Sequence, residues 1–324
     1  MDHISGNEVS RVVVGVDGSE HSERAFDMAL TIARRRQYSL KVITTYTEPG
    51  YEYIPPSMHG MAREQAQRDL DDVLVRAEGV EVEVSSQAIE GDAAGVLTAE
   101  SSQAALVVVG KRGRSRFAGR FLGSVSASVA AYSRCPSLIV PEDRGSEEHL
   151  ETQFSRLSGQ RELTEFGVIP SEELDDATDF SGSVVVGVDV DVDPAELVLQ
   201  AAQYAEGHDA TLILVSAQPF SSSLWLPISP IYGAEIPDLR QGVATRLAEV
   251  ANHVAEQTKI PVSWRFFDAS PADALAGASQ TAHAVVVGTR GRGGFTGLLL
   301  GSVSQAVLNR AVAPVLVIPT TSGR

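Results

Sequence analysis

Two glycine-rich segments carry the residues with the clearest chemistry in this sequence. The first reads Gly110-Lys111-Arg112-Gly113, then nine residues, then Gly123-Ser124. It follows the apolar run 106–109, which predicts a buried strand, and precedes the alanine- and valine-rich run 125–131, which predicts a helix. Such a loop directs backbone N–H groups and the positive end of the helix dipole at one point, where glycines let an anion approach closely. The segment therefore predicts a phosphate site, with the Ser124 hydroxyl as a helix cap or a phosphate donor.

The same spacing returns 178 positions later, at Gly288-Thr289-Arg290-Gly291 and Gly301-Ser302. Further upstream, Val185-Val186-Gly187-Val188-Asp189 repeats Val13-Val14-Gly15-Val16-Asp17 at an offset of 172. Two copies with one internal spacing indicate a duplicated domain. Because the two offsets differ, the second copy gains six residues between its first strand and its third helix.

Alternating strands and helices must position both motifs. In the first copy we expect strands at 11–17, 40–46, 80–89, 105–110 and 137–141, and helices at 22–36, 61–77, 92–102 (capped by Asp92) and 124–133. In the second copy we expect strands at 183–189, 211–217, 261–268, 283–288 and 314–318, and helices at 194–206, 238–257, 271–281 and 302–310. This alternation predicts an α/β fold of two tandem doubly wound domains, each a parallel sheet with helices on both faces.

Composition sets the remaining boundaries. We expect an N-terminal tail (1–10), a first domain (11–141), an acidic linker (142–182), a second domain (183–319) and a C-terminal tail (320–324). The linker holds twelve Asp/Glu against three Lys/Arg and so supplies −9 of the net charge of −16, a composition that favours an exposed segment. This excess of negative charge argues against binding to nucleic acid or to anionic membranes.

The cysteine content and the apolar runs favour a cytoplasmic protein. Cys135 is the single cysteine, which excludes an intramolecular disulfide and fits a reducing compartment. The apolar runs have the length of strands and stop short of the roughly 20 residues that a membrane-spanning helix needs. The polar segment 1–10 does not read as a signal peptide. We therefore expect cytoplasmic localisation without membrane insertion.

The pattern G-x2-G-x9-G-[ST], after a first strand that ends V-x-V-D, resembles the ATP-binding branch of the universal stress protein family in its tandem two-domain form. The resemblance covers about 16–141 and 183–319. It implies the strand order 3-2-1-4-5 in each five-stranded sheet, with ATP bound where the order reverses between strands one and four. It also implies backbone contacts to adenine near the end of strand two, at Tyr46 and Ala217 or their neighbours.

The predicted site residues thus lie at the ends of three strands and at the start of the last helix. A carboxylate beside a triphosphate is repelled unless another group intervenes, so Asp17 and Asp189 would hold ribose hydroxyls, or Mg²⁺ through water. The glycines and the first helical residues would bind phosphates. The full set is Gly15, Asp17, Tyr46, Gly110, Arg112, Gly113, Gly123, Ser124 and Val125, with Gly187, Asp189, Ala217, Gly288, Arg290, Gly291, Gly301, Ser302 and Val303 in the second copy.

The second copy departs from the first just after Asp189. It has Val190-Asp191-Val192-Asp193 where the first copy has Gly18-Ser19-Glu20-His21. The change removes a flexible turn and a hydroxyl, and it adds carboxylates that disfavour a polyanion. We therefore expect ATP binding at the second site to be weaker, or to depend more on Mg²⁺.

Other interpretations of the glycine motif fit less well. The P-loop pattern GxxxxGK[ST] and the dinucleotide pattern GxGxxG after the first strand are both absent. The segment Asp17-Gly18-Ser19 is too short a match to the S-G-G-x-D-S loop of ATP pyrophosphatases. No G-x-S-x-G elbow precedes a helix, and the seven histidines show no metal-ligand spacing. One alternative stays open: the glycines serve only tight turns.

We expect an ATP-binding regulator of the stress response, in which nucleotide occupancy of two similar sites changes conformation or partner binding. The expected ligand is an adenine nucleotide, and the expected assembly is a homodimer of two-domain chains. We predict no catalytic residue, because the sequence offers no general base, so turnover would be slow at most. The alternatives are a slow ATP hydrolase or self-phosphorylating protein, with Ser124 or Ser302 as acceptor, and a scaffold with vestigial sites.

Overall fold

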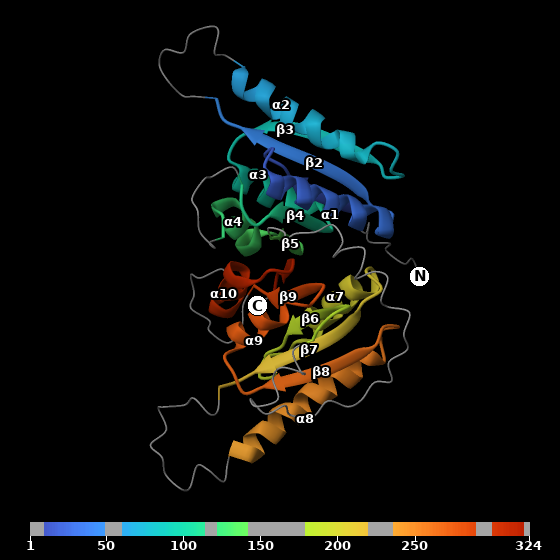
Figure 1. Ribbon diagram of the computed structural model, residues 1–324, viewed down its shortest axis with the longest axis vertical. Helices are drawn as coiled ribbons and strands as arrows, with labels where there is room; N and C mark the ends of the chain where they lie inside the picture. The colour runs from blue at the N-terminus through green and yellow to red at the C-terminus, as the bar shows by residue number, and fades with distance from the viewer. Residues whose placement is uncertain are drawn as a thin grey trace, which may run out of the picture. The chain divides into compact units, whose positions relative to one another are not determined.

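The computed structural model describes residues 10–48, 60–113, 122–141, 179–219, 236–289 and 300–320. The chain divides into two compact units, Met1–Glu142 (unit 1) and Asp143–Arg324 (unit 2), and each is described by itself (Figure 1). Several sequence predictions concern residues outside the described ranges: the linker up to residue 178, the tails 1–9 and 321–324, and both Arg290 and Gly291.

Unit 1 is a parallel sheet with the strand order β3-β2-β1-β4-β5. Helices α1 and α2 cover one face, and α3 and α4 pack together on the other (Figure 1). The strands are β1 (Arg11–Gly15), β2 (Ser39–Tyr46), β3 (Val84–Glu90), β4 (Leu106–Gly110) and β5 (Ser137–Val140). The helices are α1 (Glu20–Arg36), α2 (Met61–Leu74), α3 (Ala93–Glu100) and α4 (Ser124–Tyr132), with short 3₁₀ turns η2 (Val75–Ala77) and η3 (Ser101–Gln103).

Unit 2 repeats this arrangement with the order β8-β7-β6-β9-β10, again all parallel (Figure 1). Its strands are β6 (Ser183–Gly187), β7 (Thr211–Ala217), β8 (Val262–Phe267), β9 (Ala284–Gly288) and β10 (Val315–Ile318). Its helices are α7 (Ala195–Glu206), α8 (Ile236–Ala255), α9 (Pro271–Ala278) and α10 (Ser302–Arg310). The predicted fold class, two tandem doubly wound domains with the order 3-2-1-4-5, is confirmed.

The valine runs form the centre of each sheet, because both faces of these strands are covered. Val12, Val13 and Val14 of β1 are fully buried, and the valines of β6 are buried in the same way. Strands that are buried on both faces lose the alternation of polar and apolar residues and read as continuous apolar runs. The valine runs therefore mark the middle of the sheet, and the end of each such strand lies near the strand-order reversal.

Some boundaries differ from the sequence prediction for local reasons. Helix α1 begins at Glu20, two residues before the predicted start, because the Ser19 hydroxyl caps it by accepting from the Ser22 N–H. The predicted third strand began at residue 80, but β3 begins at Val84. The four residues before it turn sharply, with the Val82 N–H donating to the carbonyl of Val80 at 2.8 Å.

The strand register locates the six-residue insertion. Leu40 pairs with Val12, and Leu212 pairs with Val184, so the second strands keep the offset of 172. Leu40 also pairs with Val84 and Leu212 with Val262, which is the offset of 178. The extra residues therefore lie between the second and third strands, which is the part of the chain that includes α2 or α8.

Unit 2 includes residues that precede β6. Phe180 is 1% exposed, and its N–H donates to the Thr281 hydroxyl at 2.8 Å. The Arg265 guanidinium carbon lies 4.2 Å from the centroid of the Phe180 ring, and the Phe267 ring lies 6.4 Å away. Burial lowers the pKa of the Arg265 guanidinium, and the Asp179 carboxylate acts in the opposite direction. Phe180 thus anchors the chain to unit 2 before the first strand begins.

Candidate functional site

The carboxyl ends of β1 and β4 are neighbours in unit 1, and they bring the two motifs together. A Cβ atom added to Gly113 would lie 2.3 Å from Oδ2 of Asp17, which is too close for a non-bonded contact. Gly113 and Asp17 are thus adjacent in space although they are far apart in sequence. In an open α/β sheet this edge, at the reversal of strand order, is where ligands bind.

The loop after β1 holds the Asp17 carboxylate in place. Oδ1 of Asp17 accepts from the backbone N–H of Ser19 at 3.1 Å and from its hydroxyl at 2.5 Å. The Asp17 N–H donates to the Ser22 hydroxyl at 3.2 Å. Gly18 has a φ of 72°, a left-handed conformation that glycine adopts without strain. These bonds direct Oδ1 toward the start of α1, while Oδ2 faces Gly113.

We call the segment from Gly110 to Gly123 the glycine loop of unit 1 and the segment from Gly288 to Gly301 the glycine loop of unit 2. In unit 1 the Gly123 N–H donates to the carbonyl of Lys111 at 2.9 Å, and the Ser126 hydroxyl donates to the same carbonyl at 2.8 Å. The Lys111 N–H donates to the carbonyl of Val140 in β5 at 2.6 Å. The two ends of the loop are therefore tied to each other and to the sheet.

Backbone atoms pass close to both ends of this loop, too close for a side chain at Gly110 and at a tight distance at Gly123. A Cβ on Gly110 would lie 2.8 Å from the carbonyl oxygen of His21, and one on Gly123 would lie 3.2 Å from that of Lys111. Helix α4 follows with Gly123 as its N-cap and without a side-chain cap. The side chain of Ser124 is exposed at the start of this helix. The first N–H groups of α4 therefore have no capping side chain and can face an anion.

Unit 2 holds the ends of its glycine loop with equivalent backbone bonds, but its serine hydroxyl donates to the carbonyl one residue earlier than in unit 1. The Gly301 N–H donates to the carbonyl of Thr289 at 2.7 Å, and the Thr289 N–H donates to that of Ile318 at 2.9 Å. The Ser304 hydroxyl donates to the carbonyl of Gly288 at 2.6 Å. Helix α10 likewise begins after Gly301 without a side-chain cap. The backbone bonds at the two ends of the loop are thus common to both units.

The side chains around the second loop differ from those in unit 1. The Asp191 N–H donates to Oδ1 of Asp189 at 3.1 Å, as the Ser19 N–H does to Asp17. The Asp191 carboxylate, which replaces the Ser19 hydroxyl, pairs with Nη1 of Arg246 from α8 at 2.6 Å. Thr289 stands where unit 1 has the buried Lys111. The described side chains of the second site therefore differ from those of the first, while the backbone bonds at the ends of the two glycine loops are equivalent.

Gly15 and Gly187, two of the predicted site residues, have a packing role in the structure. A Cβ on Gly15 would lie 2.7 Å from Cδ1 of Leu97, and one on Gly187 would lie 2.7 Å from Cδ1 of Leu275. These glycines let α3 and α9 pack closely against the first strand of each sheet. Their presence is explained without a ligand.

The predicted adenine positions are not equivalent in the two units. Tyr46 ends β2, and its carbonyl accepts from the Gly91 N–H at 2.9 Å. By register its counterpart in unit 2 is Gln218, whose N–H donates to the carbonyl of Phe267 at 3.0 Å. Ala217 lies one position earlier and is 7% exposed. Gln218 is therefore the residue to compare with Tyr46.

The remaining predicted residues are placed as follows. Val125 and Val303 lie in the first turns of α4 and α10, next to Ser124 and Ser302, and Arg112 is partly exposed in the glycine loop. Sequence reasoning missed the hydroxyls of Ser126 and Ser304, which tie each loop to its helix. The signal was available, because the run Gly-Ser-Val-Ser occurs at 123–126 and again at 301–304.

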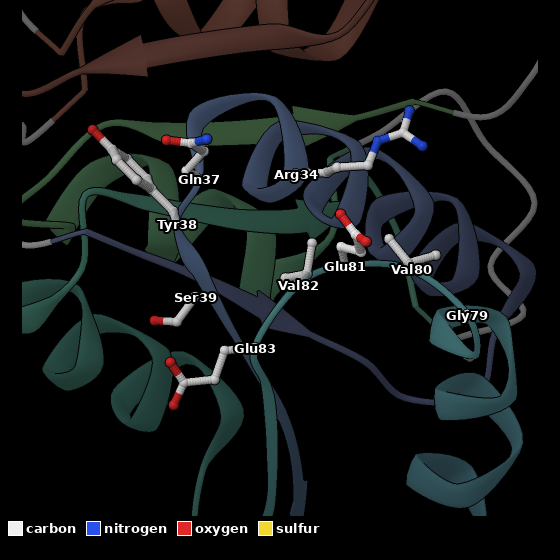
Figure 2. Close-up of a pocket in the computed structure, with 9 residues that line it drawn as sticks. All are labelled: Arg34, Gln37, Tyr38, Ser39, Gly79, Val80, Glu81, Val82 and Glu83. Atoms are coloured by element: carbon white, nitrogen blue, oxygen red, sulfur yellow. The ribbon is translucent and has the colours of Figure 1, made fainter.

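A pocket of about 550 Å³ lies elsewhere in unit 1, beside the amino ends of β2 and β3 (Figure 2). It is lined by the end of α1 and by the turn before β3, including Arg34, Tyr38, Glu81 and Glu83. Parallel sheets bind ligands at the opposite edge, beyond the carboxyl ends of their strands. This pocket is therefore separate from the candidate site.

Two kinds of feature are absent from the described residues. No group of three or more His, Cys, Asp or Glu side chains that could hold a metal ion occurs among them. None of their helices combines the length and the apolar character needed to cross a membrane.

Comparisons with known proteins agree with this architecture. The sequence model of the Universal stress protein family matches residues 8–141 and 182–319. A universal stress protein of Mycobacterium tuberculosis is 29% identical over 316 residues, which is 94% of this chain and 96% of that protein. A solved universal stress protein from Archaeoglobus fulgidus has the same fold, with a TM-score of 0.63 at 18% identity over 96% of this chain and 99% of that one. The chain belongs to the universal stress protein family, with two of its domains in tandem.

Proposed function

We propose that this protein is an adenine-nucleotide-binding regulator whose primary ligand is ATP, held at the carboxyl edge of unit 1. The observation that carries the proposal is the contact between Asp17 and Gly113, which joins a carboxylate to a glycine loop at the reversal of strand order. Beside it, α4 begins without a side-chain cap. A carboxylate next to N–H donors suits a ligand with both hydroxyls and phosphates.

Each part of the site matches one part of a nucleotide. The Asp17 carboxylate accepts hydrogen bonds, so it suits the ribose hydroxyls, or Mg²⁺ through water. The glycine loop and the first turn of α4 offer backbone N–H groups to the phosphates. The end of β2, at Tyr46 or its neighbours, supplies backbone groups for the base. Lys111 and Arg112 add positive charge after β4.

A regulatory role fits the way in which Asp17 is held. Its Oδ1 is engaged by Ser19, and its Oδ2 faces Gly113, so the carboxylate is placed to hold a ligand group rather than to activate water. Nucleotide binding would then change the surface that a partner meets. We propose a cytoplasmic homodimer as the working form and slow turnover at most.

The test is nucleotide binding by the full chain and by a Gly113→Ala variant. Any Cβ at position 113 forces the Asp17 carboxylate to move, because the two would be 2.3 Å apart. We expect ATP to stabilise the wild type by about 2.7 kcal/mol at a hundredfold excess over its Kd. We expect the variant to bind ATP at unit 1 at least about tenfold more weakly, which corresponds to about 1.4 kcal/mol.

Gly277→Ala is the matched control, because a Cβ at that position meets no atom within 4 Å. Calorimetry should give the control the same ATP affinity as the wild type. Equal binding by Gly113→Ala and the wild type would contradict the proposed site. Failure of the wild type to bind any adenine nucleotide would overturn the proposed function and favour a scaffold with vestigial sites.

A further inference from the structure

The pocket of about 550 Å³ beside the amino ends of β2 and β3 has no part in the proposed nucleotide site. The end of α1 forms one of its sides, and the segment 79–83, which precedes β3, forms another (Figure 2). All of its lining residues lie within 34–39 and 79–83, which the structure describes. Its volume falls within the range of about 300–1,000 Å³ that is usual for small-molecule sites.

Backbone hydrogen bonds hold both of these sides in place. Gln37 caps the end of α1 with a φ of 55°, and the Tyr38 N–H donates to the carbonyl of Ala33 at 2.9 Å. At the end of the segment 79–83, the carbonyl of Glu83 accepts from the Leu40 N–H at 2.8 Å. The pocket is therefore formed in the absence of a ligand, which reduces the entropy lost on binding.

Three charged side chains line the pocket, one positive and two negative. Arg34 comes from the last turn of α1, and Glu81 and Glu83 come from the segment before β3. All three are exposed, and none of the three side chains has an ion-pair or hydrogen-bond partner in the part of the chain that the structure describes. Arg35 and Arg36 follow in the same helix but do not line the pocket. The lining thus has a net charge of −1 and carries both signs.

Unit 2 repeats the backbone of this region. Asp209 has a φ of 53° where Gln37 has 55°. The Leu212 N–H donates to the carbonyl of Pro261 at 2.9 Å, and Pro261 is the counterpart of Glu83 by the offset of 178. One of the two glutamates is therefore absent from unit 2 although the backbone bond is kept.

The other two charges of the pocket are reversed in unit 2. By the offset of 172, Arg34 corresponds to Glu206, and by the offset of 178, Glu81 corresponds to Lys259. Because unit 2 forms the same backbone with opposite charges, the fold does not require the charges found in unit 1. A ligand that needs one cation and two carboxylates would bind in unit 1 only.

We propose that this pocket binds a free basic amino acid such as lysine. The α-carboxylate suits the Arg34 guanidinium, whose N–H donors match a carboxylate in geometry. The α-ammonium and the side-chain ammonium suit the carboxylates of Glu81 and Glu83, which accept hydrogen bonds. The ligand charge of +1 complements the lining charge of −1. Val80 and Val82 offer aliphatic surface to the side chain of the ligand.

The experiment follows the amide chemical shifts of the full chain by NMR at about 0.15 M salt, which screens long-range attraction to the acidic protein. Three probes differ by one group: L-lysine, cadaverine, which lacks the carboxylate, and aminocaproate, which lacks the α-ammonium. We expect lysine to shift the amides of 79–83 saturably, with a Kd on the order of 1 mM because exposed ion pairs are weak. Cadaverine and aminocaproate should each bind about threefold more weakly. The amides of 257–260 in unit 2 should not respond.

Substitutions in the pocket assign the charges to the groups of the ligand. Arg34→Gln should weaken lysine binding about threefold without weakening that of cadaverine. Glu81→Gln combined with Glu83→Gln should weaken lysine binding about tenfold. Lys259→Gln is the matched control, because it removes an exposed charge at the equivalent position of unit 2. It should leave lysine binding unchanged.

Several outcomes would overturn the proposal. Cadaverine binding as tightly as lysine to the wild type would show that the carboxylate is not recognised and that net charge alone attracts the probe. Equal shifts in the two units would show the same, and so would the absence of a saturable shift at 79–83 up to about 10 mM lysine. The proposal is independent of the nucleotide site, which lies at the opposite edge of the sheet, so Gly113→Ala should bind lysine as the wild type does.

Discussion

The two units hold their glycine loops with the same main-chain bonds but surround them with different side chains. The Gly123 N–H donates to Lys111 at 2.9 Å, and the Gly301 N–H donates to Thr289 at 2.7 Å. The carboxylate after the first strand, by contrast, is followed by the Ser19 hydroxyl in unit 1 and by the Asp191–Arg246 ion pair in unit 2. The ends of each loop are therefore held by backbone bonds, which do not depend on the charges of the neighbouring side chains.

A second difference lies on β8 and β3, the third strands of the two sheets. In unit 2 Arg265 is buried next to Phe180, whereas its counterpart in unit 1 by register, Gln87, is exposed. Unit 1 instead has an ion pair between Lys41 and Glu100 at 2.8 Å, where unit 2 has Ile213 and Ala278. The first difference lies at the candidate ligand site, whereas this one lies within the packing of each unit.

The largest expected effect is a loss of stability in unit 2 when the buried Phe180 ring is removed. Phe180→Ala removes a ring that is 1% exposed, so it should cost unit 2 about 3–5 kcal/mol. Hydrogen exchange resolved by peptide should show faster exchange in β7 and β8 and little change in unit 1. Tyr132→Ala, which truncates a side chain that is 53% exposed, is the control and should cost far less. Equal loosening of both units would show that Phe180 is not an anchor specific to unit 2.

The next effect is a loss of stability when the glycine that packs against a leucine in each unit is replaced. Gly15→Ala and Gly187→Ala each place a Cβ at 2.7 Å from a leucine Cδ1 atom, in α3 and in α9. Each should cost about 1–3 kcal/mol through overpacking, and the two costs should be similar. Chemical denaturation, followed in each unit by hydrogen exchange, measures both losses of stability. A loss of stability in one unit alone would show that the two glycines do not have equivalent packing roles.

A smaller effect is expected from the hydroxyls that tie each loop to its helix. Ser126→Ala and Ser304→Ala should each cost about 1 kcal/mol, because each removes a buried hydrogen bond to a backbone carbonyl. Exchange rates of the Gly123 and Gly301 amides should rise in the matching variant only. If neither amide responds, the hydroxyls do not hold the loops.

The smallest effect is a pH dependence of stability that comes from the Cys135 thiol. The corresponding residue of unit 2 is Ala313, which does not titrate. Burial raises the pKa of the Cys135 thiol from 9.0 to about 12. The folded state thus keeps the thiol protonated, and the resulting stability is complete below pH 9 and is lost as the pH rises toward 12. At pH 10 the loss should be about 1 kcal/mol. Urea unfolding at pH 8 and pH 10 should show a smaller drop for Cys135→Ala, and an equal drop would contradict the assignment.

Much of the fold was predictable because local patterns set it. The predicted segments 211–217 and 302–310 coincide with β7 and α10. Asp92 caps α3 as expected, accepting from the Gly95 N–H at 2.8 Å. The start of β3 was missed because the apolar residues Val80 and Val82 continue the pattern of a strand while their backbone turns.

The sequence by itself determined the duplication, the order of strands and helices, and the two glycine motifs, because these depend on periodicity and spacing along the chain. Tertiary structure decided which glycines serve packing, as Gly15 does against Leu97, and which face a carboxylate, as Gly113 does. It also decided that Arg246 reaches Asp191 and that Gln218 corresponds to Tyr46. These facts depend on contacts and register between segments far apart in sequence, which no local pattern specifies.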